Sequence, residues 1–98
     1  MNKYMIELDL PSPLTADFVT RIPAQQYAVE KLMTAGIVVS YTLSQDHSKL
    51  WMVMMADTEE QLEKTVNALP LTPFMKSRSY PLAFHNISTF RMPQMILN

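Results

Sequence analysis

The chain contains no cysteine and only one glycine among its 98 residues. Without cysteine it cannot form disulfides, thiolate nucleophiles or the cysteine-based sites of zinc and iron–sulfur clusters. One glycine is too few for the glycine-rich loops that cradle phosphate groups. Eight Lys and Arg residues against nine Asp and Glu give a net charge of −1, which provides no basic surface for nucleic acid. We therefore expect no nucleic-acid partner.

Long apolar runs are also missing. The longest one, Leu50–Ala56, has seven residues, well below the roughly 20 needed to cross a bilayer. Near the N-terminus, Lys3, Glu7 and Asp9 interrupt the apolar core that a secretory signal requires. These absences predict a soluble, cytoplasmic protein that does not bind a membrane.

The pattern of apolar residues predicts six elements of secondary structure in the order strand, helix, strand, strand, helix, strand. The predicted strands are Lys3–Leu10, Ile37–Ser44, Leu50–Ala56 and Lys76–Ala83, and the predicted helices lie between Thr15 and Gly36 and between Asp57 and Pro70. This order is typical of a ferredoxin-like α+β fold, in which two helices cover one face of a four-stranded antiparallel sheet. We expect residues 1–83 to form this single domain.

The ends of the predicted helices carry recognisable signals. Thr15 is a candidate N-cap for the first helix, and Gly36 falls where a left-handed C-terminal residue is needed. Pro23 predicts a kink or a restart inside that helix, with Thr20 as a second cap. Asp57 followed by Glu60 predicts a capping box at the start of the second helix.

Two helices leave the other face of such a sheet uncovered. We expect this face to carry Met52 and Met54, with Val38 or Met5 beside them. Four hydroxyl residues are expected among them: Ser40, Thr42, Ser77 and Ser79. Because an apolar patch of this kind is unusual on a monomer, we predict a homodimer in which two sheets pack face to face.

The C-terminal residues 84–98 contain several apolar side chains without a clear period. These are Phe84, Ile87, Phe90, Met92, Met95, Ile96 and Leu97. We predict an arm that lies over a neighbouring subunit, with a frayed terminus as the alternative.

One motif points to a family. The stretch Leu69-Pro70-Leu71-Thr72-Pro73-Phe74-Met75, followed by Pro81-Leu82-Ala83 and His85, has two prolines that end a helix and stiffen the link into the last strand. It resembles the C-terminal signature of the muconolactone isomerase family. The likeness extends more weakly over residues 1–88 and includes the aromatic Trp51 in the third strand.

The resemblance implies a dimeric α+β barrel that associates further into larger rings. It also implies an isomerase that moves a double bond in a small unsaturated lactone or related acid by proton transfer, without a metal or cofactor. In this family the first helix brings lysine and carboxylate side chains to the site, whereas the present chain has the non-titratable stretch Ile22-Pro23-Ala24-Gln25-Gln26. The Trp and Arg typical of the family's second strand are likewise replaced by Thr42 and Leu43. The alternative is therefore a barrel that only binds a small molecule or has a purely structural role.

Two residues are candidates for the proton carrier. Glu7 lies mid-strand among apolar residues, where burial would raise its pKa toward neutrality; the alternative is an interface carboxylate paired with Arg78 or Lys76. His85 follows the Pro-Leu-Ala motif and histidine changes charge near neutral pH; the alternative is a structural hydrogen-bonding group.

Four more residues are candidates for binding the substrate. Arg78 could hold a substrate carboxylate through two parallel hydrogen bonds, or lie on an exposed edge strand. Tyr27, Tyr41 and Trp51 could line an apolar pocket, or belong to the core. His47 is expected to be solvated in the predicted turn Gln45–Lys49. The two histidines, with no acidic helix pair between them, predict no metal site.

Overall fold

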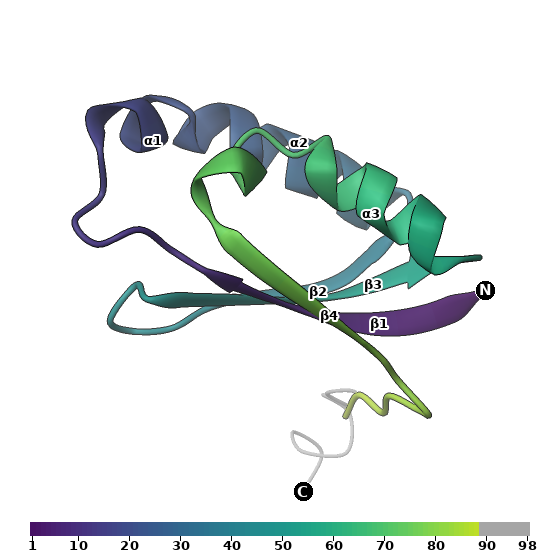
Figure 1. Ribbon diagram of the computed structural model, residues 1–98. Coiled ribbons are helices and arrows are strands. Elements are labelled where there is room, and N and C mark those ends of the chain that lie inside the picture. Colours follow the sequence, from purple (N-terminus) through teal and green to yellow (C-terminus); the bar gives the residue numbers. More distant parts are fainter. Residues whose placement is uncertain (89–98) are drawn as a thin grey trace, which may run out of the picture.

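The computed structural model describes residues 1–88, and these form a sheet covered by helices on one side (Figure 1). The elements are β1 (Asn2–Asp9), α1 (Ala16–Thr20), α2 (Ile22–Thr34), β2 (Val38–Leu43), β3 (Lys49–Ala56), α3 (Glu59–Asn67), a 3₁₀ helix (Thr72–Phe74) and β4 (Lys76–Pro81). All neighbouring strands are antiparallel, in the order β2-β3-β1-β4. The predicted ferredoxin-like α+β arrangement is confirmed.

The first predicted helix is divided in two at Arg21. The side chain of Thr15 caps α1 by accepting a hydrogen bond from the backbone N–H of Phe18. Pro23 lies in the first turn of α2, where its missing N–H costs nothing. The restart at a proline is thus confirmed, but Thr20 is not the second cap: its hydroxyl donates to the carbonyl of Asp17 instead.

The C-terminal end of α2 and the N-terminal end of α3 are capped by the residue types that the sequence signals indicate. Gly36 has φ +76 after α2, and the backbone N–H of Ile37 bonds to the carbonyl of Leu32, as in a Schellman motif. The capping box of α3 begins one residue later than predicted. Thr58 accepts from the N–H of Gln61, while the Gln61 side chain accepts from the N–H of Asp57.

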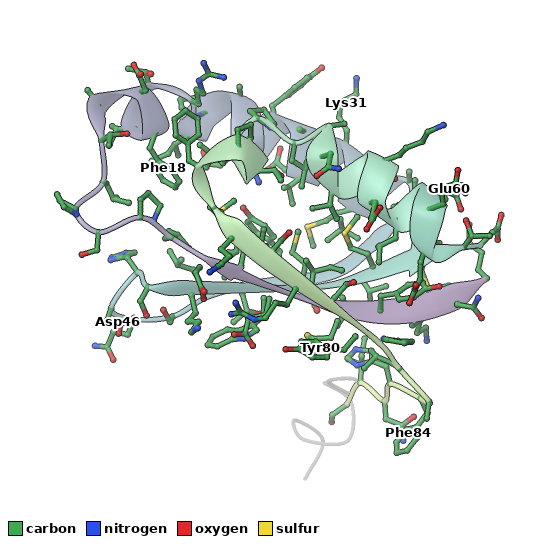
Figure 2. The ribbon with its side chains drawn as sticks, viewed as in Figure 1. Phe18, Lys31, Asp46, Glu60, Tyr80 and Phe84 are labelled. Atoms are coloured by element: carbon green, nitrogen blue, oxygen red, sulfur yellow. The ribbon has the colours of Figure 1, made fainter. Side chains whose placement is uncertain are left out.

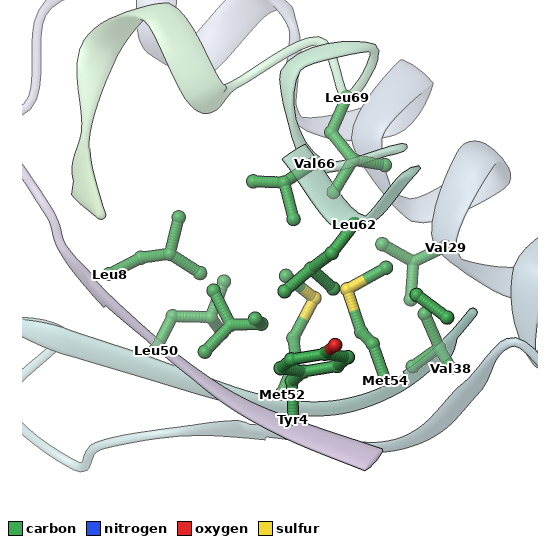
Figure 3. Packing of buried hydrophobic residues seen from close by; sticks show 12 residues of the cluster. Tyr4, Leu8, Val29, Val38, Leu50, Met52, Met54, Leu62, Val66 and Leu69 are labelled. Carbon is green, nitrogen blue, oxygen red and sulfur yellow. The ribbon is translucent and has the colours of Figure 1, made fainter. Parts of the chain in front are cut away.

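A continuous apolar core fills the space between the sheet and helices α2 and α3 (Figure 3). The strands contribute Tyr4, Ile6, Leu8, Val38, Leu50, Met52, Met54 and Ala56, and the helical side contributes Val29, Leu62, Val66 and Leu69. Alternate residues of β1 and β3 belong to this core because successive side chains of a strand point to opposite faces.

The prediction that Met52 and Met54 lie on the uncovered face is wrong. Both side chains are 0% exposed in the core beneath the helices, and Val38 lies beside them. The prediction that Ser77 and Ser79 lie on that face is also wrong, because these serines of β4 pair with core residues of β1 and share their face. The uncovered face, called the open face below, carries Met5, Ser40, Thr42, Trp51, Val53, Met55 and Tyr80.

A β-bulge in β2 explains part of this error. Val38 pairs with Met54 and Ser40 with Val53, so Val39 is an extra residue in the strand. The bulge places Val38 and Tyr41 on the same face of the sheet. In a regular strand, residues three positions apart point to opposite faces. Simple alternation therefore fails between residues 38 and 41.

After β4 the chain turns beneath the open face (Figure 1). The backbone N–H of Leu82 bonds to the carbonyl of Lys3, and Phe84 and Ile87 are 77% and 60% exposed. The structure describes the predicted arm only as far as residue 88. Its apolar residues from Phe90 to Leu97 lie outside the described range. Within the described residues, no helix is long and apolar enough to span a membrane.

Candidate functional site

An apolar pocket of about 170 Å³ lies on the helix side of the sheet. It lies at one end of the molecule, between α1 and the β2–β3 hairpin. Figure 2 labels Phe18 in α1 and Asp46 in the hairpin at this end. Its apolar lining consists of Leu10, Leu14, Phe18, Ile22, Leu43, Leu50, Leu71 and Met75. Four polar residues complete it: Gln25, Gln26, Tyr41 and His47. Apolar walls with few polar groups are typical of small-molecule sites.

The proline-containing motif forms one wall of this pocket. Leu71 and Met75 line it directly. Phe74 packs its ring edge against Phe18 with the centroids 6.1 Å apart, and the Arg21 guanidinium lies 5.2 Å from the Phe74 centroid. The motif thus connects α3 to β4 and holds α1 in place above the pocket.

Gln25 is the buried polar residue of the pocket, with 1% of its surface exposed. Its side-chain oxygen Oε1 accepts a hydrogen bond from the backbone N–H of Leu71 at 3.0 Å. Its Nε2 donates to the hydroxyl of Tyr41 at 3.4 Å. Pairing of this kind offsets the cost of burying an amide, and it joins α2, β2 and the proline-containing link around one site.

His47 lies at the pocket in the β2–β3 turn, with φ +61. The turn is organised by Asp46, whose Oδ1 accepts hydrogen bonds from the hydroxyls of Ser44 and Ser48 and from the N–H of Ser48. These bonds, from Ser48 first, lower the pKa of Asp46 to about 2. A well-ordered turn therefore fixes the backbone that presents His47.

The open face carries a separate group of charges, the charged cluster of Glu7, Asp9, Lys49 and Arg78. An Arg78 nitrogen lies 2.6 Å from Glu7 Oε2 and 3.0 Å from Asp9 Oδ1. Lys49 Nζ lies 3.2 Å and 2.6 Å from the same two oxygens. Because the four side chains keep roughly a third of their surface exposed, salt will screen these pairs.

The charged cluster lowers the pKa of both carboxyl groups. Hydrogen bonds from Arg78 and then Lys49 lower the pKa of Glu7, and other hydrogen bonds from the same two cations lower the pKa of Asp9 to about 2. The predicted rise in the Glu7 pKa is therefore wrong, since the two cations outweigh desolvation. Groups with a pKa lowered on folding stabilise the protein above about pH 4. That stabilisation is lost as the pH falls toward 2.

Replacing Arg78 by Gln tests this arrangement. We expect the pKa of Asp9 to rise from about 2 toward its ordinary 3.8, because its largest stabilising hydrogen bond is removed. The measurement is an NMR titration of the side-chain carboxyl carbons. Asp46 is the internal control, since its low pKa depends on serines of the turn. An unchanged Asp9 pKa would show that the cluster does not form in solution.

The six site residues predicted from the sequence lie in different places. Glu7, Arg78 and Trp51 meet on the open face, where Glu7 pairs across the strands with both of the others. His85 follows β4, and its Nε2 is buried without a hydrogen-bond partner among residues 1–88. Tyr41 lines the pocket on the helix side. Tyr27 is 65% exposed on α2, with Lys31 5.2 Å from its ring.

Sequence reasoning missed Gln25 and the pocket position of His47. The signal for Gln25 is its place as a polar residue on the apolar side of a helix, which indicates a buried hydrogen-bonding role. The prediction that His47 is exposed is confirmed, but its contact with the pocket depends on where the turn lies in space. Within the described residues, no group of three or more His, Asp or Glu residues could hold a metal ion.

Comparisons with known proteins agree with the fold. The family model described as muconolactone delta-isomerase matches residues 3–88. The chain is similar to the crystal structure of muconolactone isomerase, with a TM-score of 0.69 and 21% sequence identity. That match covers 91% of this chain and 96% of the other. A comparison with curated proteins gives no match.

Proposed function

The chain belongs to the muconolactone delta-isomerase family, and we propose that it is an isomerase that moves the double bond of a small unsaturated lactone. The pocket beneath α1 is the proposed substrate site. The observation that carries this proposal is a small apolar cavity whose lining includes two side chains able to exchange a proton, Tyr41 and His47. At about 170 Å³, it suits a single small ring better than a drug-sized ligand, which needs roughly 300–1,000 Å³.

The reaction needs one proton to leave carbon and another to return elsewhere. In the proposed mechanism, His47 takes the proton from the saturated ring carbon at the far end of the conjugated C=C–C=O system, and the electron pair spreads over the ring as a dienolate. Reprotonation at the other end of the conjugated system gives the isomer. Histidine suits this task because a base that titrates near the working pH transfers protons most efficiently.

The sequence-based assignment would place the reaction on the open face instead. There Glu7 or His85 would carry the proton, and Arg78 would hold a substrate carboxylate. The unpartnered Nε2 of His85 within residues 1–88 favours this version. The ion pairs and lowered pKa of Glu7 disfavour it, since a carboxylate stabilised by two cations is a weaker base.

We also propose that the open face is the interface of a homodimer. Its apolar residues Met5, Trp51 and Met55 are only half-buried and Tyr80 is 47% exposed. A two-fold pair would cover both patches at once. Phe84 and Ile87, exposed in the segment after β4, support the proposal that the described part of the predicted arm, residues 84–88, lies against a neighbouring subunit.

A proton-exchange assay tests the proposed isomerase. We expect the purified protein, incubated with muconolactone in D₂O, to shift the double bond and to introduce deuterium at the acidic carbon, as followed by NMR. The control is the same sample after irreversible heat denaturation. If the ligand binds but neither change occurs, the chain is a non-catalytic binding protein. That alternative agrees with helix α2, which brings only Ile22, Gln25 and Gln26 to the pocket.

A further inference from the structure

A second cavity, of about 220 Å³, lies beside the edge strand β4 on the helix side of the sheet. It shares no lining residue with the pocket beneath α1. We propose that this cavity, called the β4 pocket below, binds a small alkylammonium compound, with the ammonium group at its polar rim and the carbon chain on its apolar floor. The proposal does not depend on the isomerase reaction, since it concerns a different site.

The cavity exists because β4 carries small residues where its neighbour carries large ones. Ser77 and Ser79 pair with Leu8 and Ile6 of β1 and share their face of the sheet. The two apolar residues are 0% and 1% exposed, whereas both serines are exposed. Side chains as large as leucine at these two positions would extend the core to the edge of the sheet. With serines, the space between β4 and α3 stays open and is lined by two hydroxyl groups.

The rim of the β4 pocket is polar and carries a negative charge. Glu63 and Asn67 of α3 line it, and they lie on the same side of the helix because they are four residues apart. The ion pairs among residues 1–88 all belong to the charged cluster on the open face, so the Glu63 carboxylate has no cationic partner within that range. Glu59, one turn earlier, adds a second negative charge to this side of α3. The rim therefore attracts a cation.

The basic side chains nearest to this rim are directed elsewhere. Arg78 also lines the pocket, but the alternation of β4 directs its side chain to the open face, where the guanidinium donates to Glu7 and Asp9. Its main chain is therefore what borders the cavity. Lys64 of α3 lines two other hollows, one of them between α2 and α3. An anionic ligand would thus meet Glu63 without a lining cation to pair with.

The floor of the β4 pocket is apolar. It consists of Ile6, Leu62 and Val66, which are at most 5% exposed. A short carbon chain that ends in an ammonium group matches this combination, because the chain covers the floor while the ammonium group donates up to three hydrogen bonds. The acceptors at the rim are the Glu63 carboxylate, the two serine hydroxyls and the amide oxygen of Asn67. A bare metal ion would leave the apolar floor uncovered.

Three four-carbon probes test the proposal by NMR titration at pH 7. They are n-butylammonium, which is charged as a lysine side chain is, the neutral 1-butanol and the anionic butyrate. We expect n-butylammonium to bind roughly threefold to tenfold more tightly than 1-butanol, as an exposed ion pair with its hydrogen bonds allows. Butyrate should bind most weakly, and the backbone amide resonances of residues 62–67 and 77–79 should shift with n-butylammonium. Equal affinities, tighter binding of 1-butanol or butyrate, or shifts confined to other residues would overturn the proposal.

One pair of variants tests the charge of the rim. Glu63→Gln should remove most of the advantage of n-butylammonium over 1-butanol, and added salt should reduce this advantage in the unchanged protein. Glu60→Gln is the matched control, because it removes a carboxylate of the same helix that lines a different hollow. It should leave the advantage unchanged. An advantage that persists in Glu63→Gln would contradict the proposed site.

A second pair of variants tests the cavity itself. Ser79→Val should weaken the binding of both n-butylammonium and 1-butanol, because the larger side chain occupies the space beside Ile6. Ser40→Val makes the same change on the open face and should affect neither probe. Unchanged binding in a folded Ser79→Val variant would place the probes elsewhere. Because Glu63 is exposed, its replacement still tests the proposal if Ser79→Val does not fold.

Discussion

Replacing His47 by Asn is expected to lower kcat for lactone isomerisation by a factor of roughly 10²–10⁴, the usual contribution of a general acid–base group. Asn is chosen because the residue has φ +61, and Asn adopts this left-handed conformation more readily than Ala. The substitution removes the imidazole while retaining the turn. The measurement is the steady-state rate of double-bond migration, with folding checked by thermal unfolding.

His85→Asn is the matched control, since it removes the other histidine of the chain from a different side of the sheet. We expect it to leave kcat within a fewfold of the unchanged protein. The reverse result, a large loss in His85→Asn and none in His47→Asn, would move the reaction to the open face. It would then support Glu7 or His85 as the proton carrier.

Met52→Ala is expected to lower the free energy of unfolding by about 2–5 kcal/mol, the usual range for truncating a buried methionine or leucine. Met52 is 0% exposed and lies in the core between the sheet and the helices (Figure 3). Its removal leaves a cavity that the surrounding close-packed side chains can fill only in part. Chemical denaturation followed by circular dichroism measures the loss.

Met55→Ala provides the comparison, because it removes the same side chain from the same strand on the open face. We expect a smaller loss, and one that grows with protein concentration if this face is buried between two subunits, because association then contributes to stability. Equal, concentration-independent losses in the two variants would contradict the assignment of the two faces.

Much of the fold could be predicted from local chemistry. The proline at residue 23, the glycine at 36 and the threonine at 15 act within one helical turn of their own positions. Their effects are therefore visible in the sequence. The fold class could also be predicted, since a βαββαβ succession with short links leaves few antiparallel arrangements.

The faces of the sheet could not be assigned with the same success. In β3 both alternating sets are apolar: Met52 and Met54 on one side, Trp51, Val53 and Met55 on the other. Hydrophobicity alone does not distinguish them. In β2 the extra residue Val39 changes the alternation, and a bulge of this kind has no marker in the sequence.

The candidate site was predicted least well, because it combines residues from distant parts of the chain. The hydrogen bond between Gln25 and Leu71 spans 46 residues, and His47 reaches the pocket from a turn beyond both α1 and α2. The ion pairs of Glu7 reversed the pKa expected for a carboxylate among apolar neighbours. They come from β3 and β4, on either side of β1.

The sequence by itself therefore determined the elements, their order and the family, since these depend on short-range periodicity, caps and one proline-containing motif. Only the tertiary structure decided which methionines are core, that Gln25 holds Tyr41, and that Glu7 is paired with Lys49 and Arg78. The physical reason is that burial, hydrogen bonding and charge pairing depend on distances in space. In this chain those distances are set by strands and helices that are far apart in sequence.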